Sequence, residues 1–320
     1  EYLDVASKIH GEDMNGDGEG DFGSCIFKKR NAQSYFAIQT FAAPIVQTQG
    51  TAQGFHFDNA TMKPIINNEG WKKAFELYKA TGKYGPPDEL NMDIGDTRAL
   101  FKAGRCGLIV EWGDPGTLQL DDDAKSIRGK MYAISAVGST EVLDRATGKL
   151  VPVSAATAPY AVDGINYAPF AAFGGWAGAV NKGADAKTKA AAYAFLSYMN
   201  QAAQSGVDVT IGATGYNPYR TSQLASTDLW VKAGMPKALA DNYLGAINGA
   251  INNLNMASDM KIPGAQKYTS VVLDTELARY LAGEITVDEA LANIEEGWEE
   301  VTEDFGRDEQ VASQALALGL

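Results

Sequence analysis

The sequence predicts an α/β protein with two domains, and three observations support this. A helical pattern from Asp96 stops at Gly104, and a short apolar run over residues 106–112 follows it as a buried strand would. A glycine-laced strand pattern over 173–180 is likewise joined to a helix. The chain has 320 residues, 45% of them hydrophobic and 21% charged, so its length favours two domains over one.

The elements of the first hundred residues follow from periodicity and punctuation. Residues 1–9 already have a helical pattern without a preceding cap, so we expect the chain to continue a longer one. Residues 22–27 favour a strand. The stretch 35–57 has no single period and is expected to be mixed structure followed by a loop rich in Gly, Gln and Thr. Asn68 and Gly82 delimit a helix with apolar residues on one face.

The remaining elements are predicted in the same way. Residues 121–169 are expected to form hairpins and long loops, with a turn at 145–148. After the predicted strand at 173–180, Asp185 caps a helix whose apolar side includes Phe195 and Tyr198. Later helices are expected to begin at three positions, namely Pro236, Gly264 and Thr286, the last with a capping box.

Residues 13–21 resemble the first three quarters of an EF-hand loop. Oxygen donors stand at alternating positions with glycine at the sharp turn, namely Asp13, Asn15, Asp17, the backbone carbonyl of Glu19, and Asp21. The twelfth position is Ser24, which cannot close a calcium shell, and a strand follows in place of a second helix. We expect an isolated structural calcium site that joins a helix to a strand; the alternative is a polar, glycine-rich turn.

The bulk properties exclude several function classes. The net charge of −13 argues against nucleic-acid binding, and the short basic run at 28–30 is expected to be a solvated strand end. No apolar stretch reaches the ~18 residues that a membrane span needs. The histidines, His10 and His56, do not accompany a Ser or Cys nucleophile in a recognisable turn, which argues against catalysis by a triad. Cys25 and Cys106 are either buried thiols or a disulfide.

Several blocks, in order along almost the whole chain, resemble the extracellular solute-binding proteins of ABC importers, the family that includes maltose-binding protein. These blocks are the opening helix with Asp21-Phe22-Gly23, Gly70-Trp71 with Pro86-Pro87, residues 100–110, Gly174-Gly175-Trp176, residues 215–220, and residues 283–298. No single block is diagnostic, but their order and spacing are specific.

The resemblance implies a periplasmic-binding-protein type II fold, with two α/β lobes that close by a hinge on a ligand. It further implies that the fold is incomplete at the amino terminus, since the family's first strand-loop-helix unit has no counterpart before Glu1. By the family layout, residues 1–168 and 229–320 form the second lobe and 169–228 belong to the first. The implied function is non-catalytic binding of a carbohydrate or related polar solute by a monomer, for delivery to a membrane permease. The implied location is extracellular or periplasmic, with membrane attachment through the missing region left open.

A sugar site combines aromatic faces with carboxylate, amide or guanidinium groups. The resemblance places Trp176, after Gly175, beside the cleft, either as a ligand platform or as a packed hinge aromatic. Asp114 and Trp112 follow the carboxyl end of a buried strand, where ligands of open α/β sheets collect. Other candidates are each balanced against a packing or ion-pair role; these are Tyr216, Tyr219, Arg220, Tyr35, Gln39 and Tyr268.

Two alternative functions remain open from the sequence. The same fold can serve as the sensing ectodomain of a membrane receptor, and the sequence around these residues would decide between transport and sensing. A glycoside hydrolase would need an acid and a base ~5–10 Å apart. No pair stands out for that role, because the acidic run at 121–123 and the pairs Glu295-Glu296 and Glu299-Glu300 are expected to be solvated.

Overall fold

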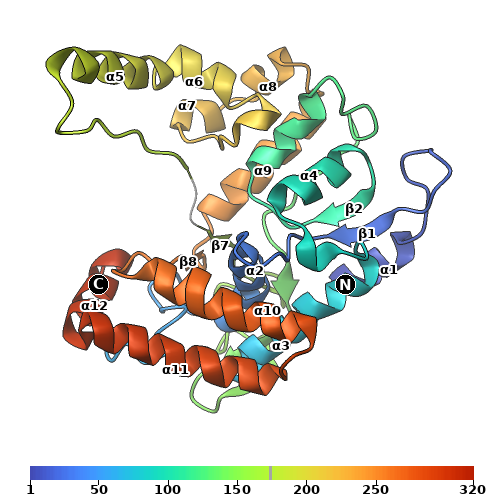
Figure 1. Ribbon diagram of the computed structural model, residues 1–320. Helices are drawn as coiled ribbons and strands as arrows, with labels where there is room; N and C mark the ends of the chain where they lie inside the picture. Colours follow the sequence, from blue (N-terminus) through green and yellow to red (C-terminus); the bar gives the residue numbers. More distant parts are fainter. Residues whose placement is uncertain (173–174) are drawn as a thin grey trace. The chain divides into compact units, whose positions relative to one another are not determined.

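A computed structural model describes residues 1–172 and 175–320 (Figure 1). They fall into two units, of which unit 1 comprises Glu1–Val110, Ser135–Ala172 and Gly249–Leu320, and unit 2 comprises Glu111–Ile134 and Phe173–Asn248. These bounds differ from the predicted division, because 111–134 and 229–248 group with the smaller unit. The predicted assignment of segments to the two lobes of the family stays a prediction.

The regular elements are mostly helical. The helices of unit 1 are α1 (Tyr2–Ile9), α2 (Ser34–Val46), α3 (Glu69–Thr81), α4 (Ile94–Lys102), α10 (Asp274–Ala282), α11 (Val287–Phe305) and α12 (Arg307–Leu318). The helices of unit 2 are α5 (Ala186–Met199), α6 (Ala202–Asp208), α7 (Thr221–Leu224), α8 (Asp228–Lys232) and α9 (Lys237–Ile251). Among the described residues, no helix combines the length and the apolar character that crossing a membrane requires.

The strands of unit 1 are short and pair two by two. β1 (Phe22–Cys25) and β2 (Cys106–Ile109) are parallel, as are β7 (Phe170–Ala171) and β8 (Ala257–Ser258). The antiparallel pairs are β3 (Gly138–Ser139) with β6 (Asn166–Tyr167), and β4 (Glu141–Asp144) with β5 (Lys149–Pro152), the hairpin expected around 145–148. A disulfide joins Cys25 to Cys106 across β1 and β2, with a Cα–Cα distance of 5.9 Å, so of the two alternatives the disulfide is the one found.

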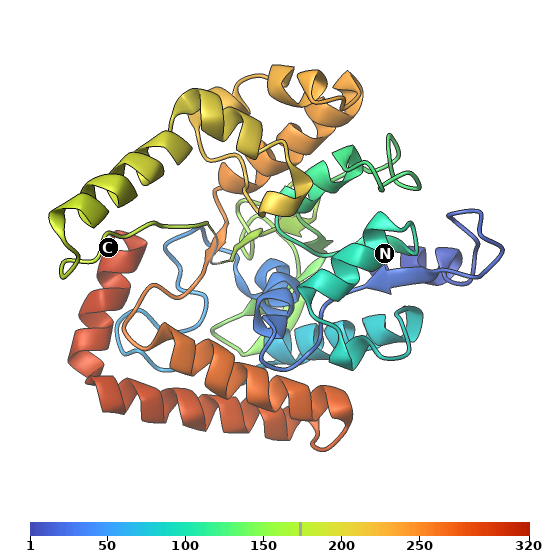
Figure 2. The same ribbon diagram turned by 45° about the horizontal axis from the view of Figure 1, so that its top comes forward.

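The core of unit 1 is built on aromatic side chains. The ring of Phe57 lies 5.2 Å from those of both Trp298 on α11 and Tyr268, and Phe55 lies 5.1 Å from Trp71 on α3. The capping box predicted at Thr286 is present and begins α11, which lies beside α10 (Figure 2). Long helices therefore pack their predicted apolar stripes onto this aromatic core.

Three local expectations about unit 1 are wrong, and one helix was not predicted. Residues 34–46 form the helix α2, which is buried nearly all round, so its sequence shows no polar face from which a helical period can be read. The N-cap of α4 is Asp93, while Asp96 is the third helical residue that closes its capping box. Residues 307–318 form α12, beyond the last predicted helix.

The third correction concerns the basic run at 28–30. Lys28 is buried instead of solvated, and its ammonium group is paired with Glu89 and donates to Thr81 Oγ1 at 2.8 Å. Glu89 Oε1 also accepts the backbone N–H of Ile26 at 2.8 Å. Burying either charge without its partners would cost free energy. The attraction between Lys28 and Glu89 and their hydrogen bonds offset this cost inside the fold.

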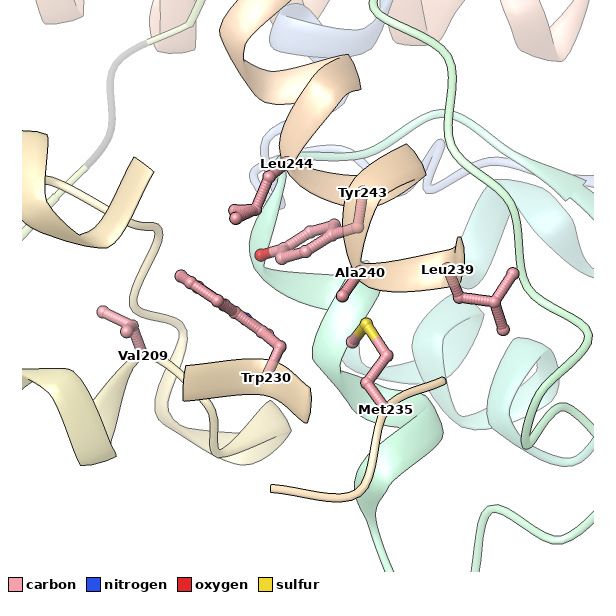
Figure 3. Packing of buried hydrophobic residues seen from close by; sticks show 7 residues of the cluster. All are labelled: Val209, Trp230, Met235, Leu239, Ala240, Tyr243 and Leu244. Carbon is pink, nitrogen blue, oxygen red and sulfur yellow. The ribbon is translucent and has the colours of Figure 1, made fainter. Parts of the chain in front are cut away.

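Unit 2 has its own hydrophobic cluster, formed mainly by α8, α9 and the residues that join them. Trp230 lies between Val209 and Tyr243, with Met235 below (Figure 3). Partly buried side chains pack against this cluster, namely Leu120, Tyr216, Leu224, Leu229 and Ile247. The predicted strand at 173–180 falls partly outside the described residues. Residues 175–180 form no strand, because no neighbouring strand pairs with them among the described residues.

Candidate functional site

The carboxyl end of β2 leads directly into the predicted ligand residues of unit 2. Asp114 begins a short 3-10 helix (Asp114–Leu120) and is only 3% exposed. Gly113 allows a close approach before it, since a Cβ there would lie 2.6 Å from Asn217 Oδ1. Trp112 is half-buried, and its backbone N–H donates to Glu111 Oε2 at 3.1 Å. A carboxylate is thus fixed beside a tightly packed turn.

Trp176 and Asp114 meet around Gly215. The indole Nε1 of Trp176 donates to the backbone carbonyl of Gly215 at 3.4 Å, near the long limit for such a bond. A Cβ at Gly215 would lie 3.8 Å from that nitrogen and 4.0 Å from Asp114 Oδ2, and Gly215 has φ +70°. The structure therefore brings two predicted residues to one point, with the Trp176 side chain 76% exposed. Gly175, with φ +95°, precedes this tryptophan.

The loop after Gly215 carries three other candidates. Tyr216 is half-buried and packs against the hydrophobic cluster of unit 2. Tyr219 is 53% exposed, and the Arg220 guanidinium lies over its ring at 5.4 Å. Arg220 also donates from Nε to Ser205 Oγ at 3.2 Å and from Nη2 to the Asn200 carbonyl. These contacts favour a positioning role for Arg220 and leave Tyr219 the more accessible of the two.

The pKa of one phenol near Asp114, that of Tyr243, is raised. Tyr243 on α9 is buried, and this burial is the main reason why the pKa of its hydroxyl lies well above the usual value. The negative charge of Asp114 raises that pKa further. Its ring packs against Trp230, with centroids 6.0 Å apart. The Tyr243 phenol therefore stays neutral and can donate a hydrogen bond close to the carboxylate. Sequence analysis did not select it, because its spacing on α9 is that of a core residue.

Three predicted residues belong to unit 1, whereas Trp176 and Asp114 belong to unit 2. Gln39 is fully buried; its Nε2 donates to the Tyr35 carbonyl at 2.8 Å, and its Oε1 is paired with His56. Tyr268 is fully buried, with its hydroxyl 2.9 Å from Thr302 Oγ1. Tyr35 is half-buried, and burial raises the pKa of its hydroxyl. Their polar groups are satisfied internally, which favours the packing alternative for Gln39 and Tyr268.

The loop at 13–21 holds oxygen donors that are already engaged. Asp13 accepts backbone N–H groups from Gly16 at 2.7 Å and Gly18 at 2.9 Å. Arg105 forms ion pairs with Asp17, Glu19 and Asp21, the last at 2.6 Å between Nε and Oδ1. Asn15 Oδ1 accepts the N–H of Asp17 at 2.9 Å. Within the described part of the chain, no three Asp, Glu, His or Cys side chains are grouped to hold a metal ion.

A polar pocket in unit 1 was not predicted from the sequence. It opens at the carboxyl end of β8, where Ser258 and Asp259 stand, and its wall includes Gln47, Phe55 and His56. The signal that could have found it is the same one that selected Asp114, namely polar residues just after a buried strand. β8 has only two residues, Ala257 and Ser258, too few for a strand pattern to be visible in the sequence.

Solved structures with the same fold were found for this chain. One is an ABC transporter solute-binding protein from Agrobacterium vitis with bound D-mannitol, at 18% identity and a TM-score of 0.60, covering 95% of this chain and 65% of that one. A second, from Agrobacterium radiobacter in complex with ribitol, has 17% identity and a TM-score of 0.62, covering 94% and 63%. Maltose-bound T. maritima MalE3 has 15% identity and a TM-score of 0.62, covering 94% and 64%.

These similarities confirm the predicted fold class, that of the solute-binding proteins related to MalE. The chain spans less than two thirds of the length of each of these three structures. No protein-family model matches the sequence. No curated protein matches it either.

Proposed function

We propose that this protein binds a neutral carbohydrate or polyol without transforming it, and delivers the solute to the permease of an ABC importer. The observation that carries the proposal is the meeting of an exposed indole, Trp176, with a buried carboxylate, Asp114, around Gly215. An aromatic face packs against the C–H face of a sugar, while a carboxylate accepts hydrogen bonds from its hydroxyl groups. Three proteins that share the fold carry mannitol, ribitol or maltose.

An extracellular or periplasmic location accompanies this proposal. The disulfide between Cys25 and Cys106 supports it, because such bonds persist mainly in oxidising compartments. Both sulfurs belong to buried residues, so the bond is of the structural kind. That the protein works as a monomer, engages a permease and closes by a hinge on its solute are further predictions of the same proposal.

Calorimetric titration with D-mannitol, ribitol and maltose tests the site. We expect saturable binding of at least one, weakened about tenfold by Trp176→Ala and about 10- to 100-fold by Asp114→Asn, since these remove an aromatic contact and a charged acceptor. Tyr193→Ala is the matched control, because Tyr193 is a 70% exposed aromatic of unit 2 outside the group. If the wild type and both site variants are folded by circular dichroism and bind with equal affinity, the binding site lies elsewhere.

Calcium binding at residues 13–21 is also part of the proposal. The candidate metal ligands are hard oxygen atoms, the class that calcium prefers. In the structure, Arg105 forms ion pairs with Asp17, Glu19 and Asp21, and calcium would compete with it for these carboxylates. Calcium at 100 times its dissociation constant is expected to stabilise the fold by about 2.7 kcal/mol, seen as a rise in Tm. The variant Asp13→Asn should abolish the rise, whereas Asp4→Asn, on the exposed face of α1, should keep it. An unchanged Tm in wild type at millimolar calcium argues for the polar turn.

A further inference from the structure

The loop at residues 13–21 is closed at its base by backbone hydrogen bonds. The N–H of Gly11 donates to the Asp21 carbonyl at 2.8 Å, and the N–H of Asp21 donates to the Glu12 carbonyl at 2.9 Å. The Asp21 side chain is buried, and its Oδ2 accepts the N–H of Met14 at 2.7 Å. This closed loop contains four carboxylates, and like charges held close together repel one another. A cation placed among them would relieve this repulsion.

Arg105 supplies such a cation from a distant part of the sequence. It directly precedes β2, and its backbone carbonyl accepts the N–H of Phe22, the first residue of β1, at 2.9 Å. Because Asp21 precedes Phe22, this bond sets Arg105 beside the end of the loop. The Nε atom of Arg105 lies 2.6 Å from Asp21 Oδ1, in an ion pair whose carboxylate side chain is fully buried. The pairing of two strands therefore decides where the guanidinium lies.

The rest of the guanidinium group reaches three further oxygen atoms of the loop. Nη1 lies 3.0 Å from Glu19 Oε2 and 3.4 Å from Asp17 Oδ2. Nη2 donates to the Gly20 carbonyl at 3.2 Å. Carboxylate and carbonyl oxygens are the ligands that calcium takes in an EF-hand loop. The planar guanidinium, with its N–H donors in a fixed arrangement, thus holds together oxygens that a metal ion would otherwise gather.

We propose that Arg105 is the internal counter-cation of this loop, which holds residues 13–21 folded without a metal ion and which a divalent cation must displace in order to bind. The inference deepens the proposed calcium binding, on which only the displacement step rests. It assigns to Arg105 the role of setting how strongly the fold depends on calcium. Without the guanidinium, the carboxylates of Asp17, Glu19 and Asp21 lose their partner, so we expect the loop to need calcium to stay folded.

Thermal unfolding of the full-length protein, in EDTA and in millimolar calcium, tests the inference. Arg105→Gln is expected to melt several degrees below the wild type in EDTA and to regain most of this loss in calcium, whereas the wild type should gain less. Arg105→Lys keeps the charge but not the fork of donors, so its behaviour should lie between the two. Arg279→Gln is the matched control, because Arg279 forms ion pairs with Glu276 and Glu284 outside the loop. The difference between its Tm and that of the wild type should be the same in both solutions.

Two further measurements separate this role from a general loss of stability. Calorimetry should give Arg105→Gln an affinity for calcium about tenfold higher than that of the wild type, since the ion no longer competes with a guanidinium. Hydrogen exchange of Arg105→Gln in EDTA should accelerate at Gly16 and Gly18, whose N–H groups donate to Asp13, more than it does in α11.

The outcomes separate this inference from the calcium proposal. If Arg105→Gln melts at the wild-type temperature in EDTA, or if calcium raises its Tm no more than that of Arg279→Gln, the role of Arg105 is overturned. Equal calcium affinities of Arg105→Gln and the wild type would also overturn it. If Arg105→Gln responds to calcium while the wild type does not, the calcium site proposed for the wild-type loop fails and the role of Arg105 stands. Should Arg105→Gln fail to fold in EDTA, Arg105→Lys carries the same comparison.

Discussion

His56 is a fully enclosed imidazole whose protonation is governed by burial. It is 3% exposed and surrounded by aromatic rings, with Phe55 at 4.7 Å and Trp298 at 5.9 Å between centroids. Its Nε2 is paired with Gln39 Oε1. Burial lowers the pKa of His56 from 6.5 to about 3, so the ring is neutral in the folded protein at physiological pH. The polar loop predicted around it is thus part of the core.

This pKa makes stability depend on pH with a defined sign. Below pH 6.5 the unfolded chain binds a proton at His56 that the folded chain excludes until about pH 3, so stability falls as pH falls across this window. Between pH 6.5 and 5.0 the loss is about 1.6 kcal/mol. Urea unfolding of His56→Gln should show this contribution missing, and His10→Gln, in an exposed position, should keep it. Equal pH slopes for wild type and His56→Gln would contradict the assignment.

The predictability of single residues depended on whether their neighbours in space are also neighbours in sequence. Asp114 was selected because a polar residue after a buried strand needs only local information. Gly215 and Tyr243, which meet Asp114 in unit 2, come from distant segments whose approach is set by packing. Gln39 and Tyr268 were candidates because polar aromatics and amides suit both cores and ligand sites. Only their contacts with His56 and Thr302 favour the core.

At the scale of elements, α5 is the exception among the long helices. It has a capped start, since Asp185 accepts from Lys187 and Thr188, but none of its residues is buried. Tyr193, Phe195 and Tyr198 are 70%, 62% and 52% exposed. A helix of 14 residues without a packed face is marginal in water, because tertiary packing supplies most helical stability. Its predicted apolar side, which includes Phe195 and Tyr198, is therefore exposed in the described structure.

Hydrogen exchange tests the stability of this helix. In a polypeptide limited to residues 1–320, the amides of α5 should show protection within about tenfold of an unstructured peptide. Those of α11, which buries Ile294 and Trp298, should exchange far more slowly. The exchange rates of both helices are measured in the same sample, so differences in solution conditions do not affect the comparison. Equal protection of α5 and α11 would mean that the α5 face is covered in solution.

Helices with two distinct faces were predictable and uniformly buried elements were not. α3 and α11 carry caps, apolar stripes and stops in the sequence, and both form as expected. α2 is buried on all sides and contains Pro44, so neither period nor composition marked it as a helix. Residues 175–180 have strand composition but lack a paired neighbour, and pairing is what makes a strand. Such cases depend on tertiary context.

At the scale of the whole molecule, the chain forms two units, each with its own hydrophobic core. Unit 2 holds the group proposed to bind the solute, Trp176 and Asp114 around Gly215. The order of sequence blocks predicted the fold correctly because each block reports a local structure. The bounds of the two units depend on which segments pack together, and the predicted assignment of segments to lobes stays a prediction.

Calorimetry of the wild-type protein with neutral polyols and sugars, followed by analysis of the recovered solute, tests the central claim most directly. We predict saturable binding of at least one compound with one site per chain, and recovery of that compound chemically unchanged. Absence of binding to every neutral solute, or release of a cleaved product, would contradict the account.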